Sequence, residues 1–224
     1  MTAQVRTVDG RIAGHRGQAT RSRLLESLGE LLASAPYRDV KVIDVARKAG
    51  TSPATFYQYF PDVETAVLEL AGDAVAEGAA LGRWAGGQSW TGKAGARSAA
   101  ELVDSFLAFW RRNEAILRVV DLSAAEGDKR FTKLRAKILT PLVRALSAGV
   151  EEVRAKGAKG DKSPKGTADE SASPTAVAGS LVTMLAATAA QLRGFQGWGV
   201  KQAELKPTLA TLVQLGMTGR KGAK

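Results

Sequence analysis

The chain of 224 residues is 45% hydrophobic and 24% charged, and its formal net charge is +10. This composition is ordinary for a soluble globular protein, and the length suits one large domain or a small domain beside a larger one. The excess of basic residues points to a polyanionic partner. The sequence has no cysteine and a single histidine, His15, which excludes a disulfide framework, a histidine or thiolate metal site and Ser–His–Asp catalysis.

The N-terminal segment, residues 1–18, is rich in glycine, arginine and polar residues, and it lacks both periodicity and the apolar run of a signal peptide. No later stretch is apolar over the length of a membrane span, so we expect a cytoplasmic protein that begins with a disordered basic arm. Residues 1–25 hold five arginines and one aspartate, a net charge of +4. Such an arm enters the minor groove of DNA in some proteins and only aids solubility in others, and the sequence leaves both open.

Residues 42–60 carry the most informative pattern. Four apolar residues in the first half recur at helical spacing, namely Val42, Val45, Ala46 and Ala49. Gly50 suits the position after the last turn of a helix, because glycine accepts the left-handed conformation. Ser52 can cap a second helix, and Pro53 fits the first position of that helix. Two short helices joined by a tight turn with a glycine are typical of the helix-turn-helix unit.

The same stretch resembles the DNA-binding head of the tetracycline-repressor (TetR) family of bacterial regulators. The positions that carry the resemblance are Ala46, Ala49, Gly50, Ser52, Thr55, Phe56, Tyr57, Tyr59 and Phe60. Two positions depart from the family pattern. Lys41 stands where the family usually has serine or threonine, and Val63 stands where it often has lysine. A phosphate contact missing at Val63 would have to come from Lys41 or from the N-terminal arm.

The resemblance implies that the second helix of the pair reads the major groove of DNA. Pro53, Ala54 and Gln58 are the candidates for base contacts, and a glutamine can pair with the edge of adenine. Hydroxyl groups and Lys41 suit phosphates, although Tyr57 or Tyr59 could belong partly to the core. The expected DNA-binding residues are Arg16, Arg21, Lys41, Thr51, Ser52, Pro53, Ala54, Thr55, Tyr57, Gln58 and Tyr59.

Hydrophobic periodicity predicts helices through the rest of the chain, and no segment has the pattern of a strand. The predicted helices cover residues 20–34, the pair within 38–60, and then 62–78, 98–112, 114–124, 129–155, 174–193 and 203–217. Glycine-rich or polar connections are expected over 82–97 and 156–173. The expected fold is therefore all-α, with about nine helices. The expected domains are a basic arm (1–18), a three-helix helix-turn-helix head (19–61), a helical regulatory and dimerisation body (62–218) and a basic tail (219–224).

Residues 87–93 spell G-x-x-x-x-G-K, which is most of a phosphate-binding loop. The next residue is Ala94, where that loop needs a serine or threonine hydroxyl for Mg²⁺, and no strand-like run precedes the segment. We therefore expect an exposed loop here rather than a nucleotide site.

The family resemblance also implies that the body holds a small apolar molecule between its helices. Aromatic residues at helical spacing would equally suit a plain core, so both readings apply to the candidates. The expected ligand-binding residues are Trp84, Phe106, Phe109, Trp110, Asn113, Phe131, Leu181, Met184, Thr188, Gln191, Phe195 and Trp198.

The expected function is sequence-specific DNA binding by a transcriptional regulator, most often a repressor in this family. The resemblance implies a homodimer through the helices over 174–193 and 203–217, a pseudo-palindromic operator and release by a small apolar ligand. The helix over 174–193 has no strongly polar face across its middle, which favours burial against a second subunit. The alternative is a non-specific or architectural DNA-binding protein without an inducer. No cofactor, metal or enzymatic activity is expected.

Overall fold

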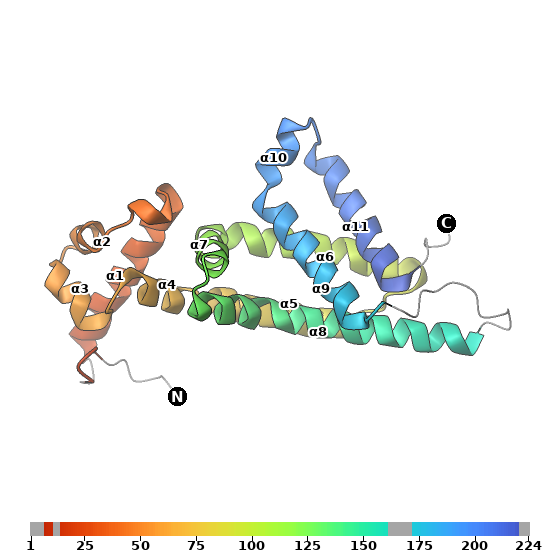
Figure 1. The fold of residues 1–224 in the computed structure, drawn as a ribbon, viewed down its shortest axis with the longest axis horizontal. Helices are drawn as coiled ribbons and strands as arrows, with labels where there is room; N and C mark the ends of the chain where they lie inside the picture. Colours follow the sequence, from red (N-terminus) through yellow and green to blue (C-terminus); the bar gives the residue numbers. More distant parts are fainter. Residues whose placement is uncertain (1–6, 11–13, 161–171, 220–224) are drawn as a thin grey trace. The chain divides into compact units, whose positions relative to one another are not determined.

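The computed structural model describes residues 7–10, 14–160 and 172–219, which form helices joined by turns and contain no strand (Figure 1). This agrees with the all-α class that the sequence predicted. The chain divides into two compact units. The first comprises residues 1–73 and 114–135, and the second comprises residues 74–113 and 136–224. None of the described helices is long and apolar enough to cross a membrane.

The first unit is built on the helix-turn-helix pair. Its elements are α1 (His15–Ser34), a 3-10 turn (Tyr37–Asp39), α2 (Val42–Lys48), α3 (Pro53–Tyr59), α4 (Val63–Leu70), α7 (Glu114–Ala125) and the start of α8 (Lys129–Gly160). Helix α1 packs against α2, α3, α4 and α7. The core side chains that are at most 1% exposed include Leu24, Leu28, Val45, Phe56 and Val67. Burying a side chain of this size stabilises the fold by roughly 1.5–3 kcal/mol.

Local signals explain where the helices of the pair begin and end. Gly50 ends α2 with a φ of 66°, in the left-handed region that glycine accepts. The Ser52 hydroxyl then accepts the backbone N–H of Thr55 at 3.2 Å and caps α3. The Asp62 carboxylate accepts the N–H of Thr65 at 2.6 Å and caps α4. Each such cap stabilises its helix by about 1 kcal/mol. Lys41 precedes α2 and provides no side-chain cap.

The second unit surrounds α6. Its elements are α5 (Gly72–Gly86), α6 (Gly92–Arg112), the remainder of α8, α9 (Pro174–Ala190), α10 (Leu192–Gly197) and α11 (Gln202–Thr218). Helix α6 packs against α9 and α11, and these two also pack on each other. The core side chains that are 0% exposed include Leu102, Phe106, Leu146, Leu185 and Val213.

Helices α5 and α8 approach each other closely through glycines. A Cβ atom at Gly78 would lie 2.3 Å from the carbonyl oxygen of Ile138. A Cβ atom at Gly82 would lie 2.6 Å from the carbonyl carbon of Pro141. Any side chain at these two positions would overlap with backbone, so the contact requires glycine.

Several predicted boundaries were wrong. Helix α1 begins at His15 rather than near Thr20, so the last residues of the predicted arm are helical. The glycine-rich connection predicted over 82–97 is helical on both sides, because α5 continues to Gly86 and α6 begins at Gly92. Its glycines permit close backbone contacts there instead of breaking the helices.

Two predicted helices are each divided. The helix predicted over 62–78 is interrupted at Ala71, ahead of Gly72 with its low helix propensity, and forms α4 and α5. The helix predicted over 174–193 ends at Ala190, and α10 follows it after Gln191. Most of the predicted loop over 156–173 and of the C-terminal tail lies outside the described residues, as do residues 1–6 and 11–13 of the arm.

Candidate functional site

Helix α3 is anchored by two phenylalanines and presents an uncharged face to solvent. Phe56 and Phe60 are 0% and 1% exposed, and their ring centroids lie 5.4 Å apart. The exposed residues at and after the start of α3 are Ser52, Pro53, Ala54, Tyr57 and Gln58. A short helix that is held on one side and free on the other can enter a major groove with its N-terminal residues foremost.

The hydroxyl groups around α3 are not all free. The Ser52 hydroxyl caps the helix and lies 3.0 Å from that of Thr55. Thr51, Thr55 and Tyr59 are half-buried. Tyr57 is 52% exposed, with its ring edge-on to Phe56 at 5.8 Å. The structure thus brings the predicted hydroxyl residues together at one end and one side of α3.

The three predicted cationic contacts differ in their surroundings. Arg16 and Lys41 are exposed, and neither forms an ion pair with a described residue. Arg21 instead forms an ion pair with Glu69 and lies over the ring of Phe60, 5.0 Å from its centroid. Its side chain is 18% exposed. Its charge is therefore compensated within the first unit, where it links α1 to α4.

Val8, in the described part of the N-terminal arm, contacts the end of α3, and no local sequence pattern predicted this contact. The backbone N–H of Val8 donates to the carbonyl oxygen of Gln58 at 2.8 Å. That carbonyl belongs to the last turn of α3, whose C=O groups have no partner within the helix. The described part of the N-terminal arm thus lies beside the C-terminal end of α3.

Polar contacts surround the two ends of the helix-turn-helix. The Tyr37 hydroxyl donates to the Glu64 carboxylate at 2.6 Å. Burial, and then this hydrogen bond, raise the pKa of Tyr37 above its usual value. Arg38 forms an ion pair with Glu126. These pairs join residues 27 and 88 positions apart, and sequence reasoning did not find them, because neither partner carries a local signal for the other.

A second group of charges lies at the start of α4. Arg130 forms ion pairs with Asp62 at 3.5 Å and with Asp128 at 2.8 Å. Partial burial acts to raise the pKa of Asp62, but the hydrogen bonds from Thr65 and the charge of Arg130 outweigh it and hold that pKa below its usual value. The pKa of Asp128 is also lowered, chiefly by its hydrogen bond from Arg130. Both carboxylates are thus held in the ionised form.

In the second unit, an aromatic cluster on α6 contains three of the predicted ligand-binding residues. Phe106 lies 5.8 Å from Phe109 and 6.1 Å from Trp110 between ring centroids, and all three side chains are buried. Trp110 is 3% exposed, and its indole nitrogen finds no hydrogen-bond acceptor within the described part of the chain. A buried N–H without an acceptor is costly in a folded protein.

The other predicted ligand residues are more scattered. Leu181 and Thr188 are buried on α9, and Met184 is half-buried. The Asn113 amide donates to Glu77 at 3.2 Å. Three further residues lie away from the cluster. Gln191 is exposed. The rings of Phe195 and Trp198 pack edge to face with their centroids 5.3 Å apart, and Trp198 is 75% exposed. Phe131 is buried in the first unit.

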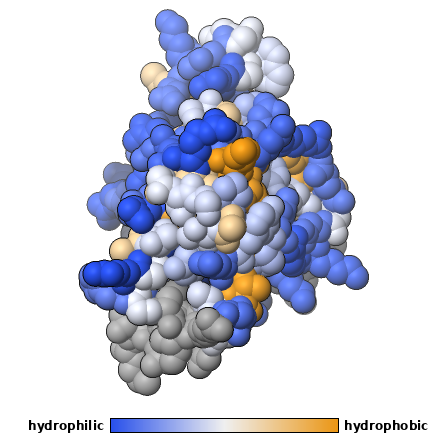
Figure 2. Space-filling view, turned by 90° about the vertical axis from the view of Figure 1, so that its left-hand side faces the viewer, coloured by the Kyte–Doolittle hydropathy of each residue, from blue (hydrophilic) through white to orange (hydrophobic). Residues whose placement is uncertain are grey.

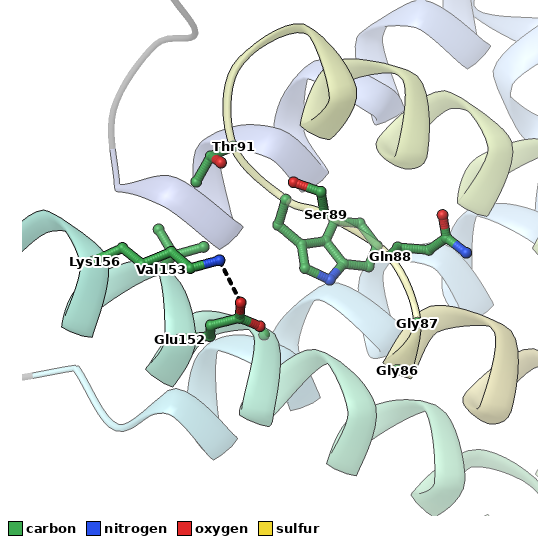
Figure 3. Close-up of a pocket in the computed structure, with 10 residues that line it drawn as sticks. Gly86, Gly87, Gln88, Ser89, Thr91, Glu152, Val153 and Lys156 are labelled. Atoms are coloured by element: carbon green, nitrogen blue, oxygen red, sulfur yellow. Dashed lines mark hydrogen bonds and ion pairs between the residues drawn. The ribbon is translucent and has the colours of Figure 1, made fainter.

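Two surface pockets lie in the second unit. A groove of about 380 Å³ between α5 and α6 is lined by Trp84 and ends at the ion pair of Glu77 with Arg112. A second pocket of about 280 Å³ lies between residues 86–91 and α8, where Lys156 pairs with Glu152 (Figure 3). Helix α5, and no strand, precedes this loop, so the strand–loop–helix arrangement of a nucleotide-binding loop does not occur here.

Figure 2 shows one face of the molecule, on which hydrophilic residues predominate and hydrophobic ones form small separate groups. Large apolar side chains that are exposed among the described residues are Val8, Ile43, Tyr57, Trp198 and Leu212.

Comparison with family models gives two matches. Residues 24–69 match the model described as bacterial regulatory proteins, tetR family. Residues 81–224 match the model described as tetracyclin repressor-like, C-terminal domain. The two matches together span the helix-turn-helix and the helical body. No match was found among curated proteins.

Solved structures of regulators share the fold. FadR from Bacillus halodurans is 14% identical with a TM-score of 0.62, over 95% of this chain and 100% of that chain. FadR from Thermus thermophilus, a TetR-family transcriptional repressor in complex with lauroyl-CoA, is 16% identical with a TM-score of 0.57, over 91% and 96%. FadR from Bacillus subtilis, in complex with stearoyl-CoA, is 14% identical with a TM-score of 0.56, over 89% and 98%.

Proposed function

We propose, from the premise that the chain belongs to the TetR family of bacterial transcriptional regulators, that it represses transcription by binding a pseudo-palindromic operator as a homodimer. The observation that carries the proposal is α3, a capped and anchored helix whose uncharged face is exposed. In this proposal residues 19–61 read DNA and residues 62–218 regulate and dimerise. Because the operator would lie on bacterial DNA, a cytoplasmic location is part of this proposal.

Base contacts are assigned to Pro53, Ala54 and Gln58, because these residues are exposed on α3. A glutamine side chain offers both a donor and an acceptor to adenine. The remaining contacts position the head on phosphates. They are assigned to Arg16, Arg21, Lys41, Thr51, Ser52, Thr55, Tyr57 and Tyr59, and Arg21 would first have to leave Glu69.

The homodimer is assigned to α9 and α11, which correspond to the predicted helices over 174–193 and 203–217. The exposed residues Thr183, Ala187 and Ala190 lie at i, i+4 and i+7 on α9 and carry no charge, so they form one uncharged stripe. A two-fold dimer would place two α3 helices in major grooves about 34–36 Å apart, on a two-fold symmetric site.

The test of operator binding is footprinting on the DNA that flanks the protein's own gene, at physiological salt with competitor DNA. A discrete two-fold protected site is expected. Gln58→Ala should weaken operator binding by about 1–3 kcal/mol without changing binding to random DNA. Gln196→Ala, which removes an exposed glutamine from α10, is the matched control. Diffuse protection that disappears with salt would instead favour the architectural alternative.

We also propose that a small apolar molecule binds in the second unit and relieves repression. Two observations support this. The indole N–H of Trp110, inside an aromatic cluster, finds no acceptor among the described residues, and acyl-CoA molecules are bound in two structures of similar fold. The ligand would place an acceptor atom against this N–H and its apolar part among the rings.

The test is thermal unfolding with a series of acyl-CoA thioesters and with flavonoids, since a flavonoid-responsive regulator shares the fold. A ligand at 100 times its Kd should stabilise the protein by about 2.7 kcal/mol. Trp110→Phe removes the N–H and should weaken this effect, while operator binding without ligand remains. If no compound shifts the melting temperature, the ligand proposal fails and the DNA-binding proposal stands.

A further inference from the structure

The turn between α7 and α8 contacts both ends of the helix-turn-helix. Gly127, with a φ of 94°, reverses the chain here. On the N-terminal side of Gly127, Glu126 forms an ion pair with Arg38, which precedes α2. On the C-terminal side of Gly127, Arg130 forms an ion pair with Asp62, which follows α3. All of these residues belong to the first compact unit.

Asp62 makes two contacts at the exit from α3. One carboxylate oxygen accepts the N–H of Thr65 and caps α4, and the other faces the guanidinium of Arg130. Only Phe60 and Pro61 separate Asp62 from the last residue of α3. Because Phe60 is buried and Asp62 is fixed by two partners, little freedom remains in the segment that follows the recognition helix.

Arg130 is itself held in place before it meets Asp62. Its guanidinium donates to both oxygens of Asp128, with Nη2 at 2.8 Å from Oδ2 and Nε at 3.3 Å from Oδ1. The backbone N–H of Arg130 also donates to Asp128, at 2.8 Å. A planar guanidinium that is oriented by one carboxylate loses little further entropy when it binds a second. Without Arg130, the carboxylates of Asp62 and Asp128 would both lose this cation.

We propose that Glu126, Asp128 and Arg130 form a clamp that fixes the two ends of the helix-turn-helix, and that Arg130 is a positioning residue for operator recognition. The inference rests on the proposed operator binding. Specific recognition requires α3 to be ordered in one orientation, so a head that is ordered in advance binds its operator more tightly. Binding to random DNA depends mainly on charge and does not need this order.

Two substitutions test the clamp, because the clamp and electrostatics alone predict opposite changes in operator affinity. Asp62→Asn keeps an oxygen for the N–H of Thr65 but removes the charge that Arg130 meets. Glu126→Gln removes the charge that Arg38 meets. Both make the protein more positive, so electrostatics alone predicts tighter binding to any DNA. The clamp predicts operator binding about two- to fivefold weaker, with binding to random DNA equal or slightly tighter. Tighter operator binding by both variants would overturn the proposal.

Arg130→Gln separates positioning from direct contact with DNA. A residue that meets a phosphate contributes about one unit to the slope of log K against log salt. The clamp predicts a weaker operator complex with an unchanged slope. The control is Arg144→Gln, which removes an equal charge from an exposed position on α8 that has no ion-pair partner among the described residues. A slope reduced by about one in Arg130→Gln, but not in the control, would make Arg130 a phosphate contact and refute its role as a positioning residue.

Hydrogen exchange of the DNA-free protein tests the clamp proposal independently of operator binding. Amides in residues 37–45 and 60–65 should exchange faster in Arg130→Gln than in the wild type, whereas those of α6 should not change. If the wild-type protein protects no discrete DNA site, operator binding fails but this measurement still tests the clamp. Equal exchange in both proteins would refute the clamp even if the operator is found.

Discussion

At the scale of single residues, the contact between α5 and α8 depends on the absence of two side chains. Gly78 and Gly82 face the backbone of Ile138 and Pro141 at distances that no Cβ could keep. Glycine normally weakens a helix by about 1 kcal/mol relative to alanine. Here the close packing of two helices offsets that cost, so the glycines stabilise the second unit rather than weaken it.

Replacing Gly82 by alanine should therefore destabilise the protein, although alanine is the better helix former. The new Cβ would meet the carbonyl group of Pro141, and overpacking of this kind costs about 1–3 kcal/mol. Urea unfolding of Gly82→Ala measures the loss. Gly86→Ala is the control, because a Cβ there would lie 4.0 Å from its nearest neighbour, Ala145. A variant at Gly82 as stable as the control would contradict the close approach.

Tyr37 should make the stability of the protein depend on pH in the alkaline range. Its burial and its hydrogen bond to Glu64 raise its pKa above the ordinary value of 10.0. Below that value the phenol is neutral in both the folded and the unfolded chain, so its stabilisation is fully present. As pH rises further, the unfolded chain loses this proton first, and the stabilisation is lost as pH approaches the folded pKa.

Urea unfolding of the wild type and of Tyr37→Phe between pH 8 and about pH 11 measures this effect. At pH 8 the wild type should be more stable by about 1 kcal/mol, the usual contribution of one hydrogen bond. The difference should shrink as the phenol ionises. A stability difference that stays constant over this range would show that folding does not raise the pKa of Tyr37.

Sequence signals predicted the residues that act on near neighbours. Ser52 and Pro53 were assigned to the start of α3 and Gly50 to the end of α2, and the structure confirms these positions. The sequence did not predict the partners of Arg21 or Arg130. A cap depends on residues three positions away, whereas these ion pairs depend on how separate helices meet, which no local pattern encodes.

At the scale of elements, the cap of α3 separates folding from DNA binding. Ser52→Ala removes the bond to the N–H of Thr55 and should cost about 1 kcal/mol of stability. Ser52→Asp can still cap the helix, so its stability should stay close to that of the wild type. The added negative charge would face phosphates, and the aspartate variant should bind all DNA more weakly. Thermal unfolding and DNA titration of both variants measure the two effects, and equal DNA binding by Ser52→Asp would place Ser52 away from the phosphates.

Amphipathic helices were predicted well, and glycine-rich segments were not. Helices α6 and α8 contain long apolar stripes, and the sequence placed most of each. The segment over 82–97 was predicted as a connection because it contains many glycines. In the structure Gly82 and Gly95 are buried in close contacts, the latter against the backbone of Trp90. Propensity describes an isolated helix, and tertiary packing overrides it where a close contact needs a small residue.

At the scale of the whole molecule, the proposed dimer makes operator binding depend on α9. Ala187 is exposed in the single chain, and a charge at this position would be buried in the proposed interface. Ala187→Glu should therefore raise the dimer dissociation constant at least tenfold. It should weaken operator binding in parallel, because one subunit meets only one half-site.

Sedimentation equilibrium measures the dimer constant. Ala136→Glu, at an exposed position on α8, is the control for the added charge. Loss of operator binding by Ala187→Glu in a protein that remains dimeric would locate the defect elsewhere, and an unaffected dimer would exclude this face of α9 from the interface.

The first compact unit is assembled from two separate stretches of chain, residues 1–73 and 114–135. Helix α7 packs on α1 and α4, and Arg118 donates to the carbonyl oxygen of Leu32 at 3.0 Å. On the ribosome, the helix-turn-helix is therefore synthesised well before the helix that covers it. At about 5–20 residues per second, several seconds pass before α7 is synthesised and can pack on the nascent head. A gene fragment that stops after residue 73 would lack α7. Transplanting the head into a chimera therefore requires both stretches.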